Sequence, residues 1–82
     1  MICAVGQIWK EDDNRFTRYV EIQKIVSKEH EDFAVVFIRG IRPNGDYTSN
    51  RPPTKALACR FGKRGGYRFE FNTKKQFIEA RR

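Results

Sequence analysis

The apolar residues of this chain come in short runs, and the longest of them covers only residues 33–38. Clusters of turn-forming residues bound these runs, at 11–14, 28–32 and 42–53. Runs of roughly four to eight residues between turns have the length of β-strands, whereas a bilayer-spanning helix needs about 20 apolar residues. We therefore expect a mainly β fold and no membrane partner.

The first half of the chain contains three expected strands, at residues 7–10, 16–27 and 33–38. Along the second of them, Val20 and Ile22 share one face, and the apolar phase then slips by one residue to Ile25. Such a slip predicts a β-bulge, which lets a strand bend around a small barrel. The run 33–38 is apolar on both faces, which favours an interior position in the sheet.

Residues 54–61 and 67–71 alternate between apolar and polar positions and predict a β-hairpin. Matching the apolar faces of the two strands places Phe61 opposite Tyr67. The loop is then 63–65, with Gly65 in the left-handed conformation. The inward-facing positions of the first strand are then Leu57, Cys59 and Phe61.

The connection 42–53 is long for so small a protein, and long loops often carry function. Its Pro43-Asn44-Gly45 segment has turn chemistry, because proline presets φ and Gly45 can take a positive φ. Pro52 and Pro53 prevent a β-ladder from continuing through them, since neither has an N–H to donate.

The C-terminal segment predicts a short helix. Thr73 stands three residues before Gln76, which is the pattern of a capping box, and the apolar Phe77 and Ile78 follow. A helix of this length does not persist alone in water, so we expect residues 73–81 to dock on the sheet.

With 82 residues, the chain has room for one domain and one core. We expect a five-stranded SH3-like barrel over residues 7–71, followed by the helix 73–81, within a single domain 1–82. The OB-fold is the other small barrel with such short strands. It usually carries a helix between its third and fourth strands, where this chain has the proline-containing connection, so the SH3-like barrel is favoured.

The charge of the chain is concentrated in its second half. Residues 1–46 hold seven Lys and Arg against eight Asp and Glu, a net charge of −1, whereas residues 47–82 hold ten against two, a net charge of +8. The two halves sum to the +7 of the whole chain. Cations gathered in this way attract a polyanion, and the expected polyanion is nucleic acid.

The predicted hairpin register places Arg60 directly opposite Arg68 on the outward face. Like charges in a cross-strand pair are destabilising, so a face that accepts them is suited to bind phosphate; the alternative is a solvated basic surface. Aromatic residues among the cations could stack on bases. The candidate nucleic-acid-binding residues are Tyr47, Arg51, Lys55, Arg60, Lys63, Arg64, Arg68, Lys74 and Lys75.

Catalytic and metal-binding patterns are not evident in the sequence. His30 stands among carboxylates in an expected turn, where adjacent side chains point apart, and no second histidine exists. Cys3 and Cys59 form no C-x-x-C pair and are expected to be free thiols in the cytoplasm. The N-terminal residues lack the pattern of a signal peptide. We expect no metal, no cofactor, no small-molecule substrate and no enzymatic activity.

The opening segment 5–15 reads Val-Gly-Gln-Ile-Trp-Lys-Glu-Asp-Asp-Asn-Arg and precedes the strand residues Tyr-Val-Glu-Ile at 19–22. It resembles the opening of short, largely uncharacterised bacterial and phage proteins that begin with Gly-Gln-hydrophobic-Trp and an Asp-rich turn. The resemblance covers mainly residues 5–26. It implies a small SH3-like barrel, related in shape to KOW and Tudor-type modules, and a phage or mobile-element origin, and it transfers no functional residues.

Two hypotheses for function follow. The first is a nucleic-acid-binding module whose contacts are mainly to the backbone and weakly sequence-specific, because no base-reading motif is visible. The alternative is a phage-type protein-interaction module or inhibitor that docks on a host nucleic-acid-processing complex. The sequence leaves open DNA or RNA, single or double strand, and the oligomeric state.

Overall fold

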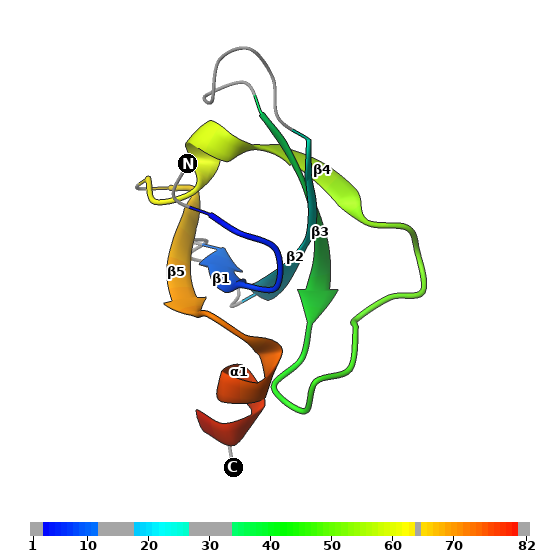
Figure 1. The fold of residues 1–82 in the computed structure, drawn as a ribbon. Helices are drawn as coiled ribbons and strands as arrows, with labels where there is room; N and C mark the ends of the chain where they lie inside the picture. Colours follow the sequence, from blue (N-terminus) through cyan, green and yellow to red (C-terminus); the bar gives the residue numbers. More distant parts are fainter. Residues whose placement is uncertain (1–2, 12–17, 27–33, 64, 81–82) are drawn as a thin grey trace.

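A computed structural model describes residues 3–11, 18–26, 34–63 and 65–80 of the chain. Its five strands form one antiparallel sheet in the order β4-β3-β2-β1-β5 (Figure 1). The elements are β1 (Ile8–Glu11), β2 (Arg18–Val26), β3 (Val35–Ile41), β4 (Thr54–Leu57), the 3₁₀ helix η2 (Ala58–Arg60), β5 (Tyr67–Phe71) and α1 (Lys74–Ala80). The predicted turn at 28–32, most of the turn at 11–14, and Arg64 lie outside the described residues.

The first three strands confirm the sequence pattern. The register of β2 against β3 shifts between Ile22 and Lys24, which is the predicted bulge. After the shift Ile25 is the partner of Val36 and packs against the cluster that contains Val20 and Ile22. β3 lies between β2 and β4, so it is an interior strand, as predicted.

The predicted hairpin between residues 54–61 and 67–71 is wrong. β4 pairs with β3, β5 pairs with β1, and the two strands lie at opposite edges of the sheet. Gly65 does take the left-handed conformation, with φ of +80°, but the turn it belongs to connects η2 to β5 rather than two paired strands.

The side chains of β4 also face the opposite way to the prediction. Ala56 and Ala58 are buried, whereas Leu57 is 46% exposed. Ala56 is the cross-strand partner of Val36, and its small side chain lets the edge strand lie close over the core. The 3₁₀ turn η2 then shifts the alternation of inward and outward side chains, so that Phe61 is buried as expected.

The sheet curves but is not closed into a barrel, because the described strands β4 and β5 form no ladder with each other. The chain crosses between these edges through η2 and a bridge that joins Phe61 to Tyr67. The two rings stack with centroids 4.7 Å apart, and the N–H of Gly62 donates to the carbonyl oxygen of Tyr67 at 2.7 Å. The five-stranded, mainly β fold with a C-terminal helix is therefore confirmed, whereas the predicted closure is not found.

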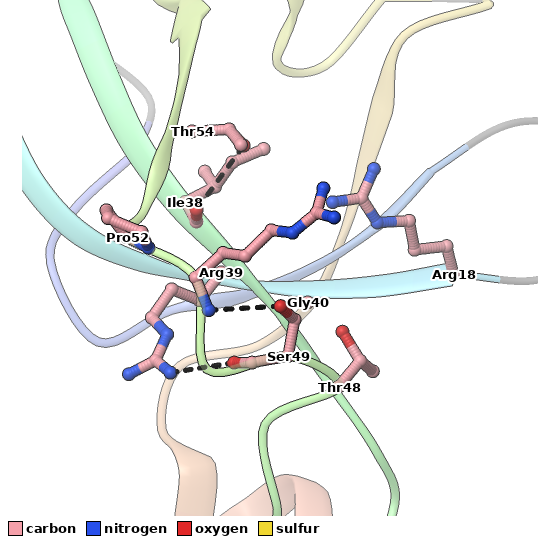
Figure 2. A pocket seen from close by; sticks show the side chains of 9 residues that line it. Arg18, Ile38, Arg39, Gly40, Thr48, Ser49, Pro52 and Thr54 are labelled. Carbon is pink, nitrogen blue, oxygen red and sulfur yellow. Dashed lines mark hydrogen bonds between the residues drawn. The ribbon is translucent and has the colours of Figure 1, made fainter.

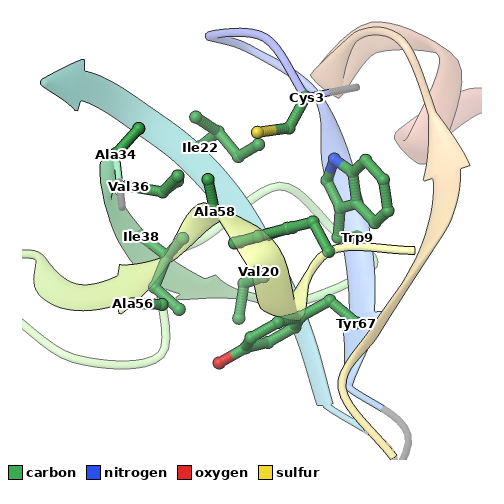
Figure 3. Close-up of a cluster of buried hydrophobic side chains, with 11 residues drawn as sticks. Cys3, Trp9, Val20, Ile22, Ala34, Val36, Ile38, Ala56, Ala58 and Tyr67 are labelled. Carbon is green, nitrogen blue, oxygen red and sulfur yellow. The ribbon is translucent and has the colours of Figure 1, made fainter. Parts of the chain in front are cut away.

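Both faces of the sheet bury apolar side chains, and we call them the inner and the outer face. Trp9 lies in the buried cluster of the inner face (Figure 3), and its ring makes a T-shaped contact with that of Phe61, with centroids 5.1 Å apart. The inner cluster consists of Cys3, Trp9, Val20, Ile22, Ala34, Val36, Ile38, Ala56, Ala58, Phe61 and Tyr67. The outer cluster consists of Ile8, Ile41 and Phe77, with Tyr19, Tyr47 and Phe71 packed against it.

Helix α1 begins with the predicted cap and covers part of the outer face. The N–H of Gln76 donates to Oγ1 of Thr73 at 3.2 Å, and Oε1 of Gln76 accepts from the N–H of Asn72 at 3.1 Å. Phe77 inserts into the outer cluster, so a single buried side chain holds the helix at the end of the sheet where β3 and β5 finish (Figure 1).

Candidate functional site

The candidate site lies where the ladder between β3 and β4 stops. The last pair of that ladder is Ile38 with Thr54, because the residues before Thr54 are Pro52 and Pro53. Beyond this pair the connection 42–53 passes along the edge of β3. A groove of about 410 Å³ remains between the connection and the strand (Figure 2).

Hydrogen bonds hold the connection over the end of β3. The N–H of Thr48 donates to the carbonyl oxygen of Gly40 at 3.0 Å, and Arg39 donates through Nη2 to the carbonyl oxygen of Ser49 at 2.9 Å. A Cβ at position 40 would run into Oγ1 of Thr48, so glycine allows the close approach. Oγ of Ser49 accepts from the N–H of Arg51 at 3.0 Å and orders the backbone of that arginine.

The groove combines cations with hydroxyl groups. Arg18, Arg39 and Arg51 line it; Arg18 reaches toward it from β2, whereas the guanidinium of Arg39 is held at the carbonyl oxygen of Ser49 (Figure 2). Its hydroxyl side chains are those of Thr48, Ser49 and Thr54. None of the described residues that line it is acidic. Guanidinium groups and hydroxyls are the donors that proteins use for phosphate oxygens, so the groove has the chemistry of an anion site.

Arg18 connects the groove to a fourth arginine. Its Nη1 lies 3.4 Å from Oε2 of Glu11, an ion pair that is partly open to solvent. The guanidinium carbon of Arg60 lies 4.9 Å from the ring centroid of Tyr67. Burial raises the pKa of Tyr67, the Glu11 carboxylate acts in the same direction, and Arg60 and Arg18 oppose both. Arg60 thus lies over the Tyr67 ring just beyond the groove, and both arginines favour the ionised form of its hydroxyl.

The structure divides the predicted binding residues among several places. Arg51 lines the groove, and Arg60 lies beside Tyr67. Lys63 is exposed in the turn between η2 and β5, and Lys75 is exposed on α1. Lys55 lies on β4 opposite Phe37 of β3 and does not line the groove itself. Of the nine predicted residues, Arg51 is the one among the groove's described lining.

The predicted opposition of Arg60 and Arg68 is wrong, because β4 and β5 are not paired. The cross-strand partner of Arg68 is Lys10 of β1, and Nε of Arg68 lies 3.7 Å from Oε1 of Glu70. The single basic hairpin face expected from the sequence therefore does not form.

Tyr47 lies at the junction of the connection, the sheet and α1. The guanidinium carbon of Arg39 lies 4.0 Å and Nζ of Lys74 lies 4.7 Å from its ring centroid. Its hydroxyl donates to Oε1 of the buried Glu21 at 2.6 Å. With its ring and its hydroxyl both engaged, Tyr47 braces the groove wall, and a base would have to displace a cation to stack on it.

Sequence reasoning missed Arg18 and Arg39. Both lie in the first half of the chain, where acidic and basic residues balance, so charge density did not mark them. Their positions in the sequence were the available signal. Arg39 directly follows the apolar run 33–38, and Pro52 and Pro53 indicate where a neighbouring strand cannot continue its pairing.

Among the described residues, no group of three or more His, Cys, Asp or Glu side chains could hold a metal ion, and both cysteines are free. No helix in the described parts of the chain is long and apolar enough to cross a membrane. Comparisons with models of protein families, with curated proteins and with solved structures found no match.

Proposed function

We propose that this protein is a nucleic-acid-binding module without enzymatic activity, which holds the phosphate backbone in the groove beside β3. The observation that carries the proposal is a groove lined by Arg18, Arg39 and Arg51 and by three hydroxyl-bearing residues, whose described lining has no carboxylate. The net charge of +7 brings a polyanion to the protein, and the groove supplies specific donors for it.

The contacts that this site offers are contacts to phosphate, which fix the position of a nucleic acid but carry no base sequence. We therefore propose binding that is backbone-dominated and weakly sequence-specific. Arg60 extends the groove, and Lys55, Lys63, Arg64, Arg68, Lys74 and Lys75 contribute further positive charge. We also propose that the fold is an opened relative of the SH3-like barrel and that the protein works in the cytoplasm.

The test is a titration of labelled single-stranded and duplex DNA and RNA at several salt concentrations. The logarithm of the binding constant should fall linearly with the logarithm of salt, by about 0.7 per neutralised phosphate for single strands and about 0.9 for duplex DNA. Arg51→Ala should weaken binding and lower that slope by about one such increment. Arg51→Lys should recover only part of the affinity, because lysine keeps the charge but lacks the planar fork.

Arg42→Ala is the matched control, because Arg42 is exposed and does not line the groove. Equal losses in Arg42→Ala and Arg51→Ala would assign the affinity to overall charge and contradict a groove site. The phage-type protein-interaction alternative makes a different prediction: capture of a host protein would survive nuclease treatment, and oligonucleotide affinity would be independent of Arg51.

A further inference from the structure

A row of three side chains crosses the outer face of the sheet at the end away from α1. Phe37 of β3 is the cross-strand partner of Lys24 of β2 on one side and of Lys55 of β4 on the other. Partners in an antiparallel pair project from the same face, so the two lysines flank the ring. Both lysines are exposed and Phe37 is partly exposed.

On the side away from α1 the next row is apolar, whereas toward α1 the next outward pair is Arg39 with the buried Glu21. Val26, Val35 and Leu57 form the next row of partners along the same strands, and Leu57 is 46% exposed. Phe37 belongs to neither of the two buried clusters, since α1 covers the outer face around Ile8 and Ile41 instead. The sheet thus presents an aromatic ring with a cation on either side.

Two tyrosines that lie beside cations are engaged elsewhere. Tyr47 has a guanidinium carbon 4.0 Å from its ring centroid, and Tyr67 is stacked on Phe61 in the core. Phe37 has a looser contact, with Nζ of Lys55 at 5.9 Å from its ring centroid. An exposed lysine at that distance can reach a phosphate and leave the ring for a base.

The row is continuous with the groove. Arg39 follows Phe37 by two residues along β3, a rise of about 7 Å, and Thr54 of the groove is the direct neighbour of Lys55 along β4. A chain of nucleotides held by its phosphates at Arg39 and Arg51 can therefore continue over the edge strand to Phe37.

We propose that Phe37 is a base-stacking platform, with Lys24 and Lys55 as its phosphate contacts, and that the ligand is a single-stranded nucleic acid. The inference rests on the proposed function and specifies its substrate class. Bases in a duplex are stacked on each other and offer no free face to the ring, whereas unpaired bases stack on aromatic side chains whatever their sequence.

The experiment compares Phe37→Ala with Leu57→Ala, which removes an exposed apolar side chain from the same face without removing a ring. The probes are a labelled single-stranded oligonucleotide, the matching duplex, and inorganic polyphosphate, which has no bases. Phe37→Ala should weaken single-strand binding roughly 5- to 150-fold, the range for loss of one stacked base, and leave polyphosphate binding unchanged. Leu57→Ala should change neither.

Phe37→Trp keeps the platform and reports on it directly, because its added fluorescence should be quenched when the single strand binds. Normal binding of the single strand by Phe37→Ala would overturn the inference and would assign the apolar row to a protein partner. Equal loss of affinity for the single strand and for polyphosphate would also overturn it. Failure of the proposed function would look different: polyphosphate and oligonucleotides would not bind, or Arg51→Ala would have no effect.

Discussion

Replacing Phe77 with alanine should release α1 from the sheet. Among the described residues of that helix Phe77 alone is buried, with 0% exposure, and its ring lies 5.0 Å from that of Tyr19 and 5.7 Å from that of Phe71 between centroids. Truncating a buried phenylalanine costs about 3–5 kcal/mol. A helix of seven residues cannot persist once it is undocked.

The loss is large compared with the stability of so small a protein. At roughly 0.05–0.15 kcal/mol per residue, a chain of 82 residues has about 4–12 kcal/mol in total. A loss of about 3 kcal/mol corresponds to a fall in Tm of about 12–24 °C at the sensitivity of a domain this size. The inner cluster is separate from Phe77, so the sheet should survive while α1 unfolds.

Thermal melting by circular dichroism measures the fall in Tm, and amide hydrogen exchange shows which elements lose stability. The amides of α1 should lose protection while those of β2 keep more of theirs. Glu79→Ala is the control, because it alters an exposed position of the same helix and should shift stability by less than about 0.5 kcal/mol. A Tm change in Phe77→Ala no larger than in this control, or retained protection in α1, would refute the reasoning.

Three further predictions concern the packing of single groups. Gly66→Ala should lower Tm, because its Cβ would meet the backbone oxygen of Arg60, which cannot rotate away; an unchanged Tm would contradict this contact. Burial raises the pKa of Tyr67, so the neutral hydroxyl stabilises the fold below pH about 10, and this stability is lost as the pH rises through the folded-state pKa. Urea titrations at alkaline pH should therefore show a smaller loss of stability in Tyr67→Phe than in the unmodified protein. An equally steep loss in the variant would contradict this assignment. Burial also raises the pKa of the Cys3 thiol, which lowers its reactivity toward an alkylating reagent. Mass spectrometry of the folded protein should therefore find Cys59 alkylated before Cys3. Faster labelling of Cys3 would contradict its burial.

The sequence predicted well the features that depend on neighbouring residues. The bulge in β2 follows from the slip between Ile22 and Ile25, and the cap of α1 follows from Thr73 and Gln76. The positive φ of Gly45, at +94°, follows from turn chemistry in the same way. Each of these needs only a few adjacent positions, so the local pattern contains the information.

Strand pairing was predicted poorly. Segments 54–61 and 67–71 look like a hairpin because they alternate and are joined by a short glycine-containing turn. The chain instead bends through η2, and β4 pairs with β3 while β5 pairs with β1. An alternating strand fits several neighbours equally well, and which one it takes depends on how the whole core fills.

The amino-acid order by itself determined that this chain forms short strands, a bulge, a proline-terminated edge and a capped helix, with its excess positive charge in the second half. Only the tertiary structure decided that Arg18 and Arg39 join Arg51 in one groove, and that Lys24 and Lys55 flank Phe37. The physical reason is that periodicity and capping are properties of adjacent residues. A binding surface depends on which strands lie side by side, and that is set by the packing of the entire sheet.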